Sequence, residues 1–260
     1  MILNHTNNIP WFTFSNLEPF QEIFHGIFTR NGGVSAHPFD SLNTAMGIGD
    51  DPECVMKNRE RILKVSGLKR LVFARQVHET GVLVYKNSDQ NIDQNIDQDD
   101  YEPQTGDAMI TDIPGLCLAI QVADCQPVLV YDPRHRVVAN IHSGWKGSIQ
   151  NIIAETINTM KVVFNTSPED IVAGIGPSLG QCCAEFINYR TEIPKRYWVN
   201  KNESDHIDFW AISCKQLEDA GVKKDRINIG GLCTKCSTDH FFSYRKEKTT
   251  GRFSALIGIQ

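Results

Sequence analysis

The sequence predicts a single-domain mixed α/β sandwich, with mixed or antiparallel sheets flanked by helices. Three observations predict this class. Short apolar runs alternate with segments of helical periodicity along the 260 residues. Two apolar runs flank a turn sequence at 132–135, as in a β-hairpin. No Pro/Gly/Ser-rich linker with a composition shift divides the chain, so we expect residues 1–260 to fold as one domain.

In the first part of the chain, residues 1–22 carry no clear pattern, and residues 23–29 predict a strand that runs into the turn at Gly32-Gly33. Helical spacing, Asp51-Pro52 at the start and Gly67 after the end predict a helix over 51–65. Strands are expected at 71–76 and 82–85. The polar repeat at 87–100 has too little apolar surface to offset the entropy of ordering and is expected to be a mobile surface insertion.

The second part is better patterned. Strands are expected at 116–123, 128–131 and 137–141, and one long amphipathic helix at 147–164. A strand at 171–175 ends in Gly176-Pro177, and a helix at 208–221 is capped by Asp208. Two late strands are expected at 227–229 and 254–259.

Composition and charge exclude several function classes. The net charge of −5 and the pI of about 5.9 provide no broad basic field for nucleic acid. No apolar run approaches the roughly 18 residues of a membrane span, and the first residues lack the pattern of a signal peptide. We therefore expect a cytoplasmic protein without nucleic-acid or membrane partners; no feature of the sequence assigns an oligomeric state.

Three residues of metal-ligand type fall where an apolar strand gives way to a loop, namely His78, Cys125 and His142. Their wide spacing is weak support for a metal, and each histidine alone is more often structural. Together, however, two histidines and one cysteine leave a fourth position open for water or substrate, as in catalytic zinc sites. The sequence thus suggests a catalytic zinc centre.

Proton transfer beside such a metal needs a carboxylate, and Asp124 and Glu185 are the candidates. A turn residue that caps the strand end is an equally good interpretation of Asp124. A rival metal cluster, Cys182-Cys183 with Cys233 and Cys236, is a weaker hypothesis, because adjacent cysteines rarely both reach one tetrahedral metal.

Four cationic residues stand in turn-rich contexts, and such residues beside exposed backbone N–H groups are typical of phosphate pockets. They are Arg30, Lys146, Arg245 and Arg252. For any one of them alone, an ordinary surface charge is the simpler interpretation. Trp145, Phe241 and Phe242 are candidates for stacking on a base, although aromatic residues at such positions more often belong to the core.

A series of short motifs resembles the laccase-domain, or multicopper polyphenol oxidase, family, whose members are described as purine nucleoside phosphorylases. The motifs occur in order from about residue 23 to the C-terminus: HGIFTRNGGVS (25–35), DSLN (40–43), GD (49–50), QVH (76–78), GDA (106–108), VADC (122–125), HSGWKG (142–147), GIGP (174–177), CT (233–234), FFSYR (241–245) and TGR (250–252). Lys146 stands where arginine is common, Glu79 where glycine is usual, and the repeat at 87–100 is an unusual insertion.

The resemblance implies a zinc ion on His78, Cys125 and His142, the same set that the strand ends indicate. It implies phosphorolysis of adenosine, inosine and S-methyl-5′-thioadenosine to the base and the (methylthio)ribose 1-phosphate, with adenosine deaminase activity. Within the motifs we assign phosphate or substrate binding to Arg30, Asn43, Lys146, Ser243 and Arg245.

Three other functions compete with this interpretation. Copper oxidase chemistry is disfavoured because the eight histidines include no HxH pair. An amidase or hydrolase that edits peptidoglycan precursors would use Cys125 as nucleophile and His142 as base, which conflicts with metal binding by the same thiolate. The third is a metal-stabilised binding module without turnover.

Overall fold

Two six-stranded sheets packed face to face form the centre of the protein in this computed structural model, which describes residues 1–87 and 103–260. The first sheet has the order β1 (Ile2–Thr6), β2 (Ile9–Thr13), β3 (Ile23–Phe28), β12 (Phe253–Ile259), β7 (Leu116–Val122), β4 (Arg70–Phe73). The second has the order β11 (Ile227–Ile229), β10 (Val172–Ile175), β8 (Gln126–Asp132), β9 (Val137–Ser143), β6 (Ala108–Thr111), β5 (Val82–Tyr85).

Both sheets are mixed. Most neighbouring strands are antiparallel, including the hairpin of β8 and β9 around the turn at 132–135. Parallel pairs lie at the edges, where β4 joins β7, β5 joins β6 and β11 joins β10. The predicted class, a mixed α/β sandwich, is confirmed. Apart from Asn87, the insertion predicted at 87–100 lies outside the described residues.

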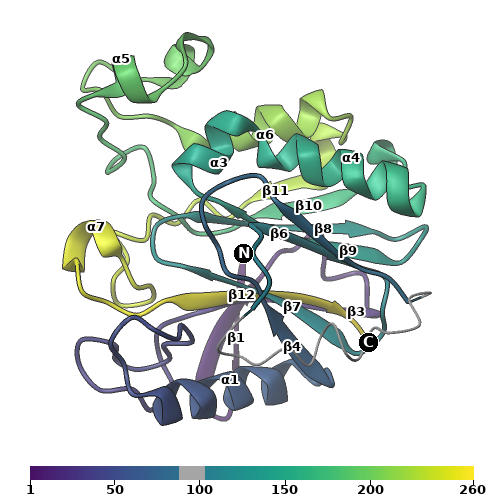
Figure 1. Ribbon diagram of the computed structural model, residues 1–260, viewed down its shortest axis with the longest axis vertical. Helices are drawn as coiled ribbons and strands as arrows, with labels where there is room; N and C mark the ends of the chain where they lie inside the picture. The colour runs from purple at the N-terminus through teal and green to yellow at the C-terminus, as the bar shows by residue number, and fades with distance from the viewer. Residues whose placement is uncertain (88–102) are drawn as a thin grey trace.

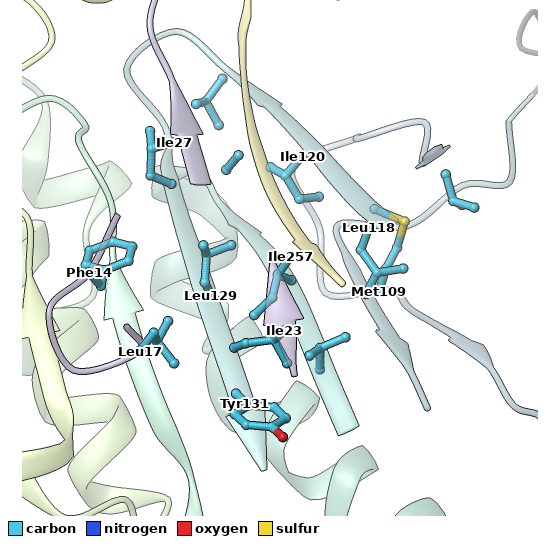
Figure 2. Close-up of a cluster of buried hydrophobic side chains, with 14 of the residues drawn as sticks. Phe14, Leu17, Ile23, Ile27, Met109, Leu118, Ile120, Leu129, Tyr131 and Ile257 are labelled. Carbon is cyan, nitrogen blue, oxygen red and sulfur yellow. The ribbon is translucent and has the colours of Figure 1, made fainter. Parts of the chain in front are cut away.

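The main hydrophobic core fills the space between the sheets (Figure 2). Leu118, Ile120 and Ile257 of the first sheet meet Leu129 and other apolar side chains of the second, and these four named side chains are fully buried. Strands buried on both faces read as continuous apolar runs, which is why 116–123 and 128–131 are recognisable in the sequence. The paired sheets therefore provide a rigid base for the loops at their ends.

Helices cover the outer face of each sheet (Figure 1). One apolar cluster joins α1 to the first sheet, and another joins α4 and α6 to the second. The helices of residues 1–87 and 103–260 are α1 (Pro52–Ser66), α3 (Trp145–Gln150), α4 (Ile152–Phe164), α5 (Tyr189–Glu192), α6 (Phe209–Asp219) and α7 (Tyr244–Glu247), with 3₁₀ turns at Pro168–Asp170, Lys195–Asn200 and Lys224–Arg226. No helix in the described part of the chain is long and apolar enough to cross a membrane.

The prediction of one continuous helix over 147–164 is wrong, because two helices occupy this segment. Asn151 adopts a left-handed conformation, with a φ of 66°, and its side chain accepts a hydrogen bond from the backbone N–H of Ala154. The residue thus ends α3 and caps α4. Continuous apolar spacing across residues 149–160 hides this break, since the sequence pattern does not register a change of helix axis.

The first strands were missed by the sequence pattern. β1 and β2 form a hairpin joined at Asn7 and Asn8, whose φ angles of 51° and 64° are those of a tight two-residue turn. The signal was the asparagine pair, which tolerates positive φ. β6 was also missed, and the strand expected at 71–76 ends at Phe73. The strand expected at 137–141 continues through Ser143 as β9, so His142 lies inside a strand.

Candidate metal centre

The three side chains predicted as metal ligands converge, although they come from separate parts of the chain. His78 lies in the loop after β4, Cys125 in the turn between β7 and β8, and His142 near the end of β9. Their ligand atoms all lie within 4.8 Å of one another, and Cys125 Sγ is 3.8 Å from His78 Nε2. Because β8 and β9 pair next to this turn, the hairpin itself brings Cys125 beside His142.

Asp107 holds two of these residues in place. Its carboxylate is fully buried and accepts a hydrogen bond of 2.7 Å from His142 Nδ1, which leaves Nε2 of that ring directed to the cluster. The same carboxylate accepts from the backbone N–H groups of Val77, His78 and Glu79 at 2.9–3.2 Å. These contacts fix the loop at His78, which has a positive φ of 64°. Asp107 is therefore the residue that orients the centre.

The charges of the cluster reinforce one another. Burial opposes ionisation of Cys125, but the nearby charge of His142 and hydrogen bonds from both histidines outweigh it and lower the pKa of the thiol to about 6. Burial also opposes protonation of His142, yet the Cys125 thiolate and Asp107 raise its pKa to about 9. Burial alone would raise the pKa of Asp107, whereas its hydrogen bonds from His142 and the backbone lower it. The ionised thiol of Cys125 and the protonated ring of His142 therefore stabilise each other.

Gly144 is required by the close approach of the cluster. A Cβ atom at this position would lie 2.7 Å from His78 Cδ2 and 3.3 Å from Cys125 Sγ. The φ of −69° is open to any residue, so the restriction is steric and comes from the three side chains. The glycine in the HSGWKG motif therefore makes room for the cluster.

The residues fit a zinc ion. Tetrahedral Zn–N bonds of about 2.0–2.1 Å and Zn–S bonds of about 2.3 Å place ligand atoms roughly 3.5 Å apart. The Sγ–Nε2 distance of 3.8 Å between Cys125 and His78 is close to this value. A carboxylate that accepts from the distal nitrogen of a histidine ligand, as Asp107 does, is the usual support of such a site. All three ligand candidates line one cavity, which leaves a fourth position accessible to a small molecule.

The cavity has a volume of about 1040 Å³ and mixes cationic and aromatic side chains. Such a volume accommodates a drug-sized ligand. Aromatic rings of Trp145, Phe186 and Tyr244 contribute to its wall. Its described cationic side chains are Arg59, Arg75, Arg245 and Arg252.

Of the two predicted proton carriers, only Asp124 lines the cavity. Its carboxylate accepts from the hydroxyls of Thr234 and Ser243 at 2.6 and 2.7 Å and from the backbone N–H of Arg245 at 2.6 Å. Asp124 therefore also ties two distant loops to the turn that carries Cys125. Glu185 is exposed and is absent from the described cavity lining; its backbone carbonyl accepts a hydrogen bond from Arg245 Nη1.

Among the predicted phosphate ligands, Arg245 lines the cavity and Arg30 does not. The Arg30 guanidinium is buried and donates to Glu247 at 2.8 Å, to Thr238 O and to Asp40 O. It also lies over the Phe242 ring. These contacts make Arg30 a link between loops.

Asn43, Ser243 and Lys146 likewise lie outside the described cavity lining. Asn43 is fully buried and bonds Asp50 and the backbone of Arg252, and Ser243 is fully buried against Asp124. Lys146 is exposed, with Nζ 5.6 Å from the Trp145 ring centroid. Arg252 does line the cavity, where its Nη1 donates to the carbonyls of Thr250 and Gly251.

Asp107 is the main functional residue that the sequence reasoning did not single out. It stands in the GDA motif, at the start of a strand that the apolar pattern did not reveal. An isolated acidic residue before a short strand gives no signal of its own. The four cysteines Cys182, Cys183, Cys233 and Cys236, given little weight from the sequence, are brought together in space.

The fold and the site together define the class of this protein: a mixed α/β sandwich with a His–Cys–His cluster in the wall of a large cavity. The chain belongs to the multi-copper polyphenol oxidoreductase laccase family, which it matches over residues 24–260. The resemblance carried by the motifs is confirmed.

Curated relatives are named for phosphorylase activity, in contrast to the oxidoreductase activity in the family's description. The chain is 34% identical over 245 residues to the purine nucleoside phosphorylase of Bacteroides thetaiotaomicron, with 90% of each chain covered. It is 30% identical to purine nucleoside phosphorylase YlmD of Bacillus subtilis, with 92% of this chain and 90% of that protein covered. For purine nucleoside phosphorylase YfiH of Escherichia coli the identity is 31%, with 89% and 91% covered.

Solved structures of relatives have the same fold over nearly the whole chain. YlmD from Geobacillus stearothermophilus superposes with a TM-score of 0.87 at 30% identity and covers 99% of this chain and 98% of that one. The hypothetical protein YfiH of Bacillus licheniformis gives a TM-score of 0.86 at 29% identity, with 99% of each chain covered.

Proposed function

We propose that this protein is a zinc-dependent purine nucleoside phosphorylase that cleaves adenosine, inosine and S-methyl-5′-thioadenosine with phosphate. We also propose that it deaminates adenosine. The observation that carries the proposal is the His78–Cys125–His142 cluster, which opens into a cavity that also holds arginines and aromatic rings. The relatives' name, purine nucleoside phosphorylase, supports the phosphorylase part of the proposal.

The cavity offers chemically distinct regions for the two substrates. Arg245 and Arg252 supply guanidinium groups suited to a phosphate dianion. Burial lowers the pKa of the Arg252 guanidinium, and the nearby negative charges of Cys125 and Asp124 oppose this effect without cancelling it. Phe186 and Tyr244, near the two arginines, provide ring faces for a purine. This arrangement would hold phosphate and nucleoside side by side.

In phosphorolysis, a phosphate oxygen bonds to C1′ of the ribose as the bond from C1′ to the purine nitrogen breaks. The proton lost by the phosphate ends on the leaving base, so the reaction needs no other reactant. Zinc, when bound, would supply Lewis-acid stabilisation of charge. Asp107 would orient His142, while the arginines would bind and orient phosphate. In deamination, a water oxygen would bond to C6 of the purine as the bond from C6 to the amino nitrogen breaks and ammonia leaves, and Asp124, which lines the cavity, would carry the proton from the water to the leaving nitrogen.

The test is product analysis with each of the three nucleosides, with and without phosphate. We expect free base and a pentose 1-phosphate only when phosphate is present, and inosine from adenosine in either condition. A Cys54→Ala variant, altered on the surface helix α1, serves as the matched control and should retain both activities. Absence of base release from all three nucleosides in the presence of phosphate would refute phosphorolysis.

One observation favours a second candidate function, a hydrolase or amidase with Cys125 as nucleophile. The ligand atoms of Cys125 and His142 lie within 4.8 Å of each other, and the nearby charge of His142 helps to lower the pKa of the thiol to about 6, as in an activated cysteine. Metal-free protein that hydrolyses an amide and loses activity stoichiometrically to iodoacetamide would support this function. Full protection of the thiol by bound zinc, with activity only in the zinc form, would exclude it.

A further inference from the structure

A second cluster of metal-ligand residues lies outside the cavity lining. Cys182 and Cys183 follow β10, while Cys233 and Cys236 follow β11, and their four sulfur atoms lie within 4.8 Å of one another. All four are free thiols. Two loops that are separated by about 50 residues in the sequence therefore present four thiols to one point.

The sulfur positions fit a tetrahedral metal. Zn–S bonds of about 2.3 Å place two sulfurs on one tetrahedral zinc roughly 3.8 Å apart. Cys236 Sγ lies 3.7 Å from Cys182 Sγ and 3.6 Å from Cys183 Sγ. A disulfide would need an S–S distance of about 2.05 Å. The spacing thus matches that of two ligands on one ion and is too long for a disulfide.

Local backbone geometry explains how adjacent cysteines both reach this point. The chain turns tightly at Gly180, whose carbonyl accepts hydrogen bonds from the backbone N–H groups of Cys183 and Ala184. A Cβ atom at Gly180 would lie 3.0 Å from Cys233 Cβ, so glycine permits the close approach of the two loops. This turn removes the objection that neighbouring cysteines point apart.

Four thiols whose sulfur atoms lie within 4.8 Å of one another are suited to a divalent cation. Thiolates gathered at one point would repel one another, and a bound divalent ion offsets this repulsion and displaces the thiol protons.

We propose that Cys182, Cys183, Cys233 and Cys236 bind a second, structural zinc ion that joins the loops after β10 and β11. All four ligand positions are filled by protein, which is the arrangement of structural zinc. The ion would hold Thr234, next to Cys233, where its hydroxyl donates to Asp124 at 2.6 Å. The backbone carbonyl of Asp124 also accepts a hydrogen bond of 2.8 Å from the backbone N–H of Leu179. The structural zinc would therefore stabilise the turn that carries Cys125.

The test is elemental analysis of protein purified with reductant and without chelator. We expect about two zinc ions per chain in the wild type and about one in each of Cys236→Ser and His142→Ala. Cys54→Ser, at a thiol outside both clusters, should keep about two. The zinc that remains in Cys236→Ser measures occupancy of the cavity site, and the zinc that remains in His142→Ala measures occupancy of the thiol cluster. Because zinc content is measured directly, the result does not depend on nucleoside turnover.

A second measurement applies even if Cys236→Ser fails to fold. Cobalt added to metal-depleted His142→Ala protein should give the intense visible bands of a tetrahedral tetrathiolate complex. Zinc in that variant should also raise its melting temperature by on the order of 5–10 °C. Iron in place of zinc, a disulfide among the four thiols in freshly reduced protein, or no tetrathiolate spectrum would overturn the proposal.

Discussion

Asp107 connects the backbone around His78 with the ring of His142, and it does so from a position with no exposure to solvent. One carboxylate thereby sets the direction of two of the three candidate ligands. The hydrogen bond at His142 Nδ1 also selects the tautomer that leaves Nε2 available. At the scale of single residues, the candidate centre depends as much on Asp107 as on its ligands.

Asp107→Asn keeps the size of the side chain and removes its charge. We expect the cavity zinc to bind about 10–100-fold more weakly, because His142 loses its charged acceptor. Zinc retained against increasing chelator concentrations measures the effect. Asp112→Asn, at the other end of β6, is the matched control; the thiol cluster is unchanged in both variants. Equal zinc retention in the two variants would show that Asp107 does not support the site.

Gly144→Ala tests the steric argument. The added methyl group would collide with His78 and crowd Cys125, so we expect loss of the cavity zinc and a decrease in turnover of about 100-fold in a folded protein. Gly81→Ala is the control, because its Cβ would meet its nearest neighbour, Gly106, at an ordinary 3.6 Å. Normal zinc content in Gly144→Ala would contradict the close packing described here.

Much of the site could be predicted from single residues, and the remainder could not for physical reasons. His78, Cys125 and His142 stand at the ends of recognisable apolar runs. Asp107 and the role of Arg30 depend on long-range contacts, such as the pairing of Arg30 with Glu247. The local sequence does not indicate which distant residue a charged side chain will contact.

At the scale of elements, the longer buried strands, such as β7 and β8, and the capped helices were the predictable parts, whereas the short buried strand β6 was not. Asp51 and Asp208 cap α1 and α6 as their positions suggest, with side chains that accept from the backbone of Glu53 and Ala211. The break at Asn151 was missed because the apolar spacing continues across it. The β1–β2 hairpin was missed because its strands have only a weak apolar pattern. The boundaries of β4 and β9 were displaced by two or three residues, which moved His142 from a loop into a strand.

His25 links β3 to the end of β2, and this contact predicts a pH dependence of stability. Its Nε2 accepts from the backbone N–H of Phe14 at 3.0 Å, and burial lowers the pKa of His25 to about 4. As pH falls below about 6.5, the unfolded chain takes up a proton that the folded protein does not. Stability should therefore decrease between pH 6.5 and 4, by about 3 kcal/mol from this residue.

His25→Gln tests this dependence, since glutamine offers an acceptor that does not titrate. The free energy of unfolding, from urea titrations at pH 7.5 and 4.5, should change by roughly 2–3 kcal/mol less in the variant than in the wild type. His5→Gln, on the exposed strand β1 of the same sheet, controls for the loss of one histidine. Parallel curves for His25→Gln and the wild type would exclude His25 as the cause.

At the scale of the whole molecule, the two sheets and their outer helices form a scaffold, and loops from both sheets form the site. Cys125 lies where β7 of the first sheet passes to β8 of the second, so the cluster is placed at a crossing between the sheets. Asp124 connects this crossing to the loops before α7 and after β11. The proposed structural zinc would act on the loop after β11, which binds Asp124, whereas the proposed cavity zinc would bind Cys125 itself.

The most direct test of the central claim compares the wild type and Cys125→Ala for zinc content and for phosphate-dependent formation of adenine from adenosine. We expect that the variant folds, contains about one zinc ion fewer per chain, and forms adenine at least about 100-fold more slowly. Adenine formation at the wild-type rate by a variant that has lost this zinc would contradict zinc-dependent phosphorolysis.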